Sequence, residues 1–205
     1  MDINNDKKLI QLKTLVGDLI IDAHKLIREF NDRSTVSLRE IKTFNIFYEF
    51  FYTYLTNRKK VIEEQKLEKL NVIDNDFYEK LDDYSLQIYD INLSVFVCYY
   101  LRIIDKEMRE KLLDRMNKIF NKVMQKNFYD LPLREENFIV NNIKLDKGIA
   151  KNGALLENIF SLFVAINNKI PIFIIGKSGC SKSLSFQLLN KSMQGGSSES
   201  PFLKN

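Results

Sequence analysis

The sequence predicts a mostly α-helical protein, in which an N-terminal helical bundle is followed by the opening of a phosphate-loop α/β module. Two observations support this prediction. Apolar side chains recur every three or four residues through most of residues 1–126, as they do on the buried face of a helix. Farther on, the apolar run from Ile170 to Ile175 leads into a loop of glycine, serine and lysine. We therefore expect a bundle over 1–126, a linker over 127–146, and the N-terminal part of an α/β module over 147–205.

Composition supports a folded chain and gives no sign of a nucleic-acid partner. The 205 residues suffice for one domain or parts of two, and 45% of them are hydrophobic. The 31 basic and 27 acidic side chains leave a net charge of +4, which is spread along the chain rather than gathered in a block. Neither nucleic acid nor a membrane surface is therefore an expected partner.

The compartment predicted from the sequence is the cytoplasm. The first residues are polar and lack the apolar stretch of a secretory signal. The richest apolar runs, Phe44 to Leu55 and Leu93 to Ile104, are too short to cross a bilayer, so no transmembrane segment is expected. Cys98 and Cys180 lie in unrelated settings, and nothing favours a disulfide between them.

The first expected helix covers residues 6–30. Its apolar stripe recurs at helical spacing through Leu9, Leu12, Val16, Leu19, Ile20, Ala23, Ile27 and Phe30. His24 is the single histidine and lies beside this stripe. Because no cysteine or histidine partner stands at ligand spacing, we interpret His24 as a boundary residue rather than a metal ligand.

A second helix is expected to begin after Ser37, because Ser37 and Glu40 have the spacing of a capping box. An aromatic-rich stretch follows as far as Leu55, and the charged residues 59–69 indicate an exposed helix or a linker. Acidic pairs at 74–76 and 82–83 lack the spacing and glycine of a calcium loop, so turn and cap roles are expected there.

Three more helices complete the prediction upstream of the loop. The stretch 91–104 is apolar nearly all round and predicts a central helix, while 106–126 has one apolar face. Residues 127–142 contain Pro132 and a predicted short strand at residues 138–140. A helix over 152–167 would then cover one face of a sheet.

The loop after Ile175 has the composition of a phosphate-binding loop. The pattern G-x-x-x-x-G-K-[ST] places glycines where backbone amides turn toward phosphate oxygens, and it ends in a lysine and a hydroxyl. Here Gly176, Gly179, Lys182 and Ser183 take these roles, while Ser181 stands where the second glycine belongs. A left-handed backbone at Ser181 would cost roughly 1–2 kcal/mol. The alternative is a simple turn between strand and helix, with Lys182 in solvent.

The flanks of this loop carry a resemblance to a known family. Residues 147–160, 170–184 and 193–195 closely resemble one ATPase module of the giant mysterin-type ubiquitin ligases, which contain a dynein-like ring of AAA+ modules. That family also has serine at the position of Ser181. The strong resemblance covers about the last third of the chain. A weaker one makes residues 36–41 similar to the lid helix of a preceding module, which implies a lid-like bundle over 1–126.

The resemblance implies a binding site for ATP and Mg²⁺. It makes Ser183 the Mg²⁺ ligand, Ile149 and Ala150 the apolar contact to adenine, and Arg39 a sensor for nucleotide bound by a module upstream. Packing for the adenine pair and a plain surface position for Arg39 remain open alternatives. Residues implied to bind nucleotide through the loop are Gly176, Ser178, Gly179, Cys180, Ser181, Lys182 and Ser183.

Hydrolysis needs a second acid to hold Mg²⁺ and a group to orient water. The single acid after Lys182 is Glu199, which lies in a Gly/Ser loop rather than at the end of an apolar strand. We therefore expect a truncated module that holds ATP as a structural or regulatory ligand and is inactive alone. By resemblance, the parent protein would be an ATPase and ubiquitin ligase, whose partners are adjacent AAA+ modules of the same chain and the ubiquitin machinery.

One other class of function stays open. The bundle over 1–126 could serve as a helical protein-interaction scaffold, with a vestigial phosphate loop behind it. A stand-alone NTPase or kinase is not expected, because the second acid is missing.

Overall fold

The structure, a computed structural model, describes residues 3–31, 35–67 and 81–204. It is mostly α-helical, as predicted, and no strand is formed within these residues. The chain divides into two compact units, Met1–Pro132 and Leu133–Asn205. Each unit is described by itself below.

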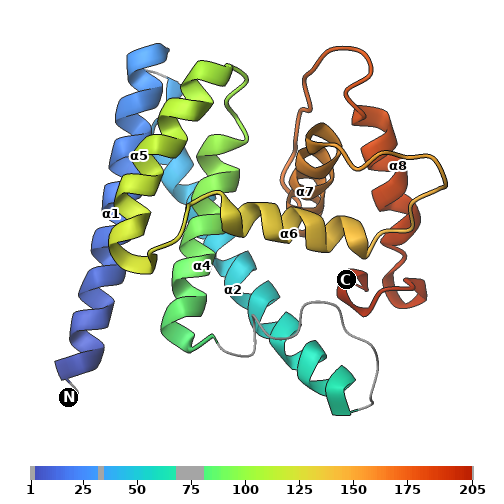
Figure 1. Cartoon of the computed structure of the whole chain (residues 1–205), viewed down its shortest axis with the longest axis horizontal. Coiled ribbons are helices and arrows are strands. Elements are labelled where there is room, and N and C mark those ends of the chain that lie inside the picture. The colour runs from blue at the N-terminus through green and yellow to red at the C-terminus, as the bar shows by residue number, and fades with distance from the viewer. Residues whose placement is uncertain (1–2, 32–34, 68–80, 205) are drawn as a thin grey trace. The chain divides into compact units, whose positions relative to one another are not determined.

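The first unit is a helical bundle. It consists of α1 (Ile3–Phe30), α2 (Leu38–Leu67), α4 (Asp83–Val95), the π-helix η2 (Phe96–Tyr100) and α5 (Lys106–Met124). Helix α1 packs against α5 and α4, and α2 packs against α4 and η2 (Figure 1). The core is built from large apolar side chains with almost no exposed surface, among them Leu19, Leu26, Phe51, Tyr89, Phe96, Tyr99 and Phe120. The apolar periodicity thus predicted the bundle correctly.

The helix starts of this unit follow from local capping chemistry. Glu40 accepts a hydrogen bond from the Ser37 N–H at 2.6 Å, which is the reciprocal half of the predicted capping box. Asp82 caps α4 by accepting from the Ser85 N–H at 2.9 Å, as the cap prediction required. The acidic residues 74–76 lie outside the described part of the chain. The charged stretch after residue 59 continues α2 as far as Leu67.

The second unit contains α6 (Asp130–Asn141), whose first turn lies at the unit boundary, α7 (Gly153–Asn167) and α8 (Lys182–Ser192). Two short 3₁₀ turns follow, Gly195–Ser197 and Pro201–Leu203. Helices α7 and α8 pack against each other and are joined by a long loop (Figure 1). Both helices bury apolar side chains, among them Leu155, Ile159, Phe160, Phe163, Leu188 and Leu189.

Two strand predictions were wrong for the described chain. Residues 138–140 lie in α6, where Pro132 falls in the first turn and therefore removes no intrahelical hydrogen bond. The Asn137 side chain also donates to the Leu133 carbonyl at 2.7 Å, within the helix. Residues 170–175 form no strand, since a strand requires a hydrogen-bonded neighbour and no described segment pairs with them.

No transmembrane segment was expected from the sequence. Among the helices of the described residues, none combines the length and the apolar character that a membrane span needs.

Candidate functional site

The candidate site is the loop that joins α7 to α8. It runs from Ile170 through a turn at 178–181, and α8 begins directly after it at Lys182. Most of this loop is exposed, including Gly176, Ser178 and Gly179, whereas Cys180, Ser181 and Lys182 are half-buried. The site therefore combines an open backbone with the N-terminus of an 11-residue helix, where free amides and the helix dipole favour an anion.

Two residues of the turn at 178–181 have left-handed backbone. Gly179 has φ of +84°, and Ser181 has φ of +56° and ψ of 17°. Ser181 is therefore left-handed, the case for which a cost of roughly 1–2 kcal/mol relative to glycine was expected from the sequence. In an anion-binding nest, left-handed residues alternate with right-handed ones so that successive N–H groups turn to one side. Gly179 and Ser181, with one residue between them, have the spacing that such an alternation needs.

Lys182 turns its ammonium group back over the loop. Its Nζ atom donates to the Gly176 carbonyl at 2.8 Å and to the Lys177 carbonyl at 2.6 Å. An ammonium has three donors and prefers charged acceptors, so the loop carbonyls can give way to phosphate oxygens. The side chain is thus directed at the loop instead of into solvent, which argues against a simple turn.

Hydrogen bonds from both flanking helices hold the backbone around Ser181. Asn158 on α7 donates through Nδ2 to the Cys180 carbonyl at 2.7 Å. On the other side, the Ser185 N–H and Oγ donate to the Ser181 carbonyl at 2.8 Å and 2.7 Å. The resemblance assigned no role to Asn158 or Ser185. A single polar residue within the apolar face of the 152–167 helix was the signal that could have pointed to Asn158.

Three further predicted site residues are Ser183, Ile149 and Ala150. The structure shows where they lie, and their roles remain predictions. Ser183 is exposed in the first turn of α8, one residue after Lys182. Ile149 is half-buried and Ala150 exposed, and both precede α7 in a turn closed by the Asn152 N–H donating to the Ala150 carbonyl at 3.0 Å. Their assigned contacts to Mg²⁺ and adenine stay predictions.

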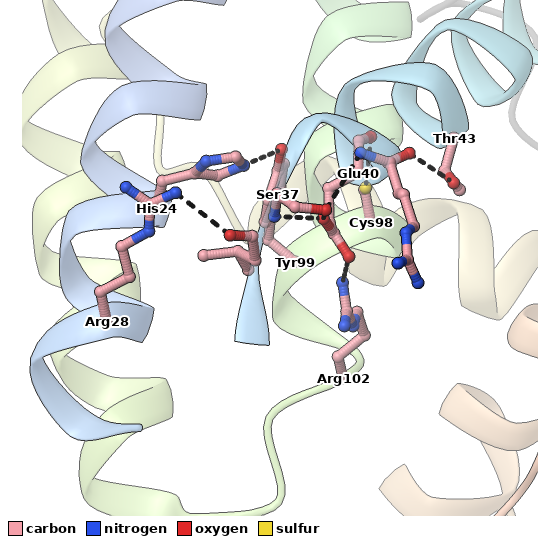
Figure 2. Close-up of polar contacts among 10 residues, drawn as sticks. His24, Arg28, Ser37, Glu40, Thr43, Cys98, Tyr99 and Arg102 are labelled. Carbon is pink, nitrogen blue, oxygen red and sulfur yellow. Dashed lines mark hydrogen bonds and ion pairs between the residues drawn. The ribbon is translucent and has the colours of Figure 1, made fainter. Parts of the chain in front are cut away.

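The predicted sensor Arg39 lies in the first unit, on the exposed first turn of α2. Figure 2 shows the polar contacts at this helix start, where Glu40 receives the Ser37 N–H and the Arg102 guanidinium, the latter at 3.0 Å. Burial alone would raise the pKa of the Glu40 carboxyl, but the Ser37 hydrogen bond and Arg102 together lower it below its usual value. These contacts fix the backbone at Arg39, while a sensor role for its side chain stays a prediction.

His24 lies at the edge of the same cluster. Its Nε2 atom is 2.9 Å from the Tyr99 hydroxyl, with the two rings edge to face (Figure 2). Burial, and then the nearby Arg28 guanidinium, lowers the pKa of His24. The histidine is half-buried at the boundary of the core, as predicted. Cys98 nearby is buried and contacts the Glu40 carbonyl through Sγ at 3.4 Å, and burial raises the pKa of this thiol to about 12.

Sequence comparisons with known proteins match the part of the chain that contains this loop. The model of the RNF213 AAA domain matches residues 148–205, which include the whole loop. The human E3 ubiquitin-protein ligase RNF213 is 28% identical over 188 residues, which is 88% of this chain and 3% of the relative. The zebrafish (Danio rerio) E3 ubiquitin-protein ligase rnf213-beta is 36% identical over 107 residues, which is 50% of this chain and 2% of the relative. The chain thus spans only about 3% of the length of the curated relatives it matches.

Both the loop and the bundle upstream of it are covered by these similarities, since the human relative aligns with most of the chain. The family match lies where the loop, the left-handed backbone and the helix N-terminus come together. Residues 148–205 therefore match the RNF213 AAA domain, and most of the chain is similar to the human RNF213 protein.

Proposed function

We propose that the AAA domain in residues 148–205 binds ATP with Mg²⁺ through the loop from Gly176 to Ser183. The observation that carries this proposal is the Lys182 ammonium, which lies over the loop carbonyls beside two left-handed residues at the start of α8. A cation, a loop with left-handed backbone and a helix N-terminus thus lie next to one another, and these are the parts that a phosphate site uses.

The residues of the loop divide the binding among them. Lys182 would supply a flexible positive charge for the terminal phosphates, and the Ser183 hydroxyl would be a Mg²⁺ ligand. The amides of Gly179 and Ser181 would supply neutral donors, and the Cys180 N–H, which donates to the Lys177 carbonyl at 3.4 Å without ligand, would join them by leaving that bond. Bound Mg²⁺ neutralises part of the phosphate charge and so favours the fully ionised nucleotide. Ile149 and Ala150 would provide the apolar contact to the base.

The same proposal makes ATP a ligand that is held, with no turnover by this chain. Glu199 is the single acid after Lys182, and it is engaged with Lys144, whose Nζ lies 2.7 Å from its carboxylate. Because the curated relatives are E3 ubiquitin-protein ligases, we place this domain in an AAA+ ring of a larger, cytoplasmic ubiquitin ligase, in which ATP has a structural or regulatory role.

Calorimetric titration of the 205-residue chain with ATP and Mg²⁺ tests the site. Lys182→Ala removes a charge-assisted contact worth about 1.5–3 kcal/mol, so we expect ATP to bind roughly 10–100-fold more weakly. Lys177→Ala is the matched control. It removes an exposed lysine of the same loop, whose contact to Lys182 is made by its backbone carbonyl. Equal ATP affinity in wild type and Lys182→Ala, or an equal loss in the two variants, would show that the site is misassigned.

A further inference from the structure

Asn158 differs from the other asparagines of α7 in what it contacts. Asn167 and Asn168 lie at the end of the helix and donate to carbonyls one turn back on the same helix, those of Phe163 and Val164. Asn158 instead reaches across to the loop, where its Nδ2 donates to the Cys180 carbonyl at 2.7 Å. The contact joins residues 22 positions apart in the sequence and is half-buried. It therefore ties the loop to α7 rather than stabilising α7 itself.

The peptide groups on either side of Ser181 are both held through their carbonyls. Asn158 holds the Cys180 carbonyl, and Ser185 holds the Ser181 carbonyl through its N–H and its hydroxyl. In a trans peptide the N–H points opposite to the C=O, and no cis bond is present in the described chain. The N–H of Ser181 is therefore turned away from Asn158, and the N–H of Lys182 away from Ser185.

This restraint matters because Ser181 adopts a left-handed backbone, which serine disfavours. A non-glycine residue avoids positive φ, yet Ser181 has φ of +56°. A loop with glycine at this position needs no external restraint to reach the left-handed region. With serine there, hydrogen bonds from outside the loop have to select that conformation.

We infer that Asn158 is a positioning residue for the phosphate loop, which keeps Ser181 left-handed and its amide free to donate to a phosphate oxygen. This inference rests on the proposed ATP site and extends it to a residue on α7. The amide side chain suits the task because it offers an N–H donor to a carbonyl without adding a charge beside the bound anion. Asn158 and Ser185 thus compensate for the missing second glycine of the loop.

The test compares Asn158→Leu with Asn167→Leu in the full 205-residue chain. The carbon chemical shifts of Ser181 and the hydrogen exchange of the loop amides are measured without nucleotide, and ATP affinity is measured separately. In Asn158→Leu we expect the left-handed shift signature of Ser181 to be lost, and ATP to bind about tenfold more weakly because an organising hydrogen bond is missing. Asn167→Leu should change neither measurement.

A second variant covers the case in which Asn158→Leu fails to fold. Asn158→Asp has nearly the same shape, but an ionised carboxylate can only accept hydrogen bonds. The Ser181 signature should therefore be absent at pH 7.5 and return at acidic pH, where the protonated carboxyl can donate to the Cys180 carbonyl.

Unchanged Ser181 shifts and loop exchange in both Asn158 variants would overturn the positioning role. This outcome is separate from a failure of the proposed function. If the wild-type chain binds no ATP, the proposed ATP site is wrong. The nucleotide-free measurements still decide whether Asn158 positions the loop.

Discussion

The two units of this chain differ in how completely they bury their apolar side chains. In the first unit, Phe51, Phe96 and Phe120 have no exposed surface, because helices satisfy their own backbone and need only pack their faces together. In the second unit, Phe173 is 89% exposed and Ile175 77% exposed, although they belong to a run of apolar residues. Such a run is buried only when strands on both sides supply hydrogen bonds and helices cover both faces. A helical bundle can thus close by itself, and a central strand cannot.

Both units bury carboxyl groups, Asp90 in the first and Glu135 and Glu136 in the second, but the second unit also carries the open loop around Lys182. The first unit buries Asp90 completely, and neither oxygen of its carboxyl has a hydrogen-bond partner within the described residues. The second unit keeps Lys182 and most of the loop backbone accessible and uses Asn158 to hold the loop in place. A buried polar group without a partner lowers stability, whereas accessible polar groups held in place are what a ligand requires.

The largest expected effect tests the contrast in packing. Phe120→Ala opens a cavity next to Phe128, whose ring centre lies 5.9 Å away, and should lower the free energy of unfolding of the first unit by about 3–5 kcal/mol. Phe173→Ala removes an exposed ring and should change stability by no more than about 0.5 kcal/mol. Urea unfolding followed by circular dichroism measures both variants. Comparable losses in the two would mean that residues 170–175 are packed, and the contrast between the units would disappear.

The next effect concerns Asp90 and pH. Burial raises the pKa of Asp90 to about 8, so the folded state keeps a proton that the unfolded chain releases near pH 4. The folded state then binds more protons than the unfolded state, and stability falls as pH rises from about 4 to 8, with a slope of at most about 1.4 kcal/mol per pH unit. Asp90→Asn keeps the shape and removes this dependence. We expect it to stabilise the first unit by something on the order of 2–4 kcal/mol at pH 7.

Unfolding curves measured at several pH values check this prediction. Asp83→Asn is the control, since Asp83 is exposed on the same helix. Tyr48 on α2 is a titratable neighbour of Asp90, and its pKa is raised by burial and then by the Asp90 charge. A variant Asp90→Asn that keeps the wild-type pH slope would show that the buried carboxyl is not its source.

The smallest expected effect concerns helix capping, and it tests whether a cap contributes the same free energy of stabilisation in both units. Asp105 caps α5 by accepting from the Met108 N–H at 2.8 Å, and Asn152 caps α7 by accepting from the Leu155 N–H at 2.9 Å. Replacement of either by alanine should cost about 1 kcal/mol, because one helix-start amide loses its partner. Residue-resolved hydrogen exchange reads the loss at each helix. Asp105→Asn and Asn152→Asp retain an acceptor and should retain most of the stability, and a full loss in either would refute the capping explanation.

Much of the fold could be predicted because helices carry their signals locally. The stripe of α1 and the capping pair Ser37 and Glu40 each lie within a few residues of the structure they predict. Residues 138–140 misled the prediction because a short apolar run with β-branched residues fits both a strand and a buried helix segment. The helical alternative prevailed through packing, with Ile139 and Val140 buried.

The candidate site divides in the same way. The loop composition predicted phosphate and Mg²⁺ roles for Gly176, Lys182 and Ser183, and the structure adds that Ser181 is left-handed. No local pattern could show that Asn158 holds the Cys180 carbonyl, because the partner lies 22 residues away and is set by the packing of α7 on α8.

From the sequence alone came most of the helices, the caps at Ser37 and Asp82 and the composition of the phosphate loop, because periodicity and capping act over one or two turns of chain. Tertiary structure decided which carbonyls Lys182 and Asn158 contact and which apolar residues stay exposed. The reason is that these outcomes depend on segments distant in sequence, and an apolar run such as 170–175 is buried only where other segments come to cover it.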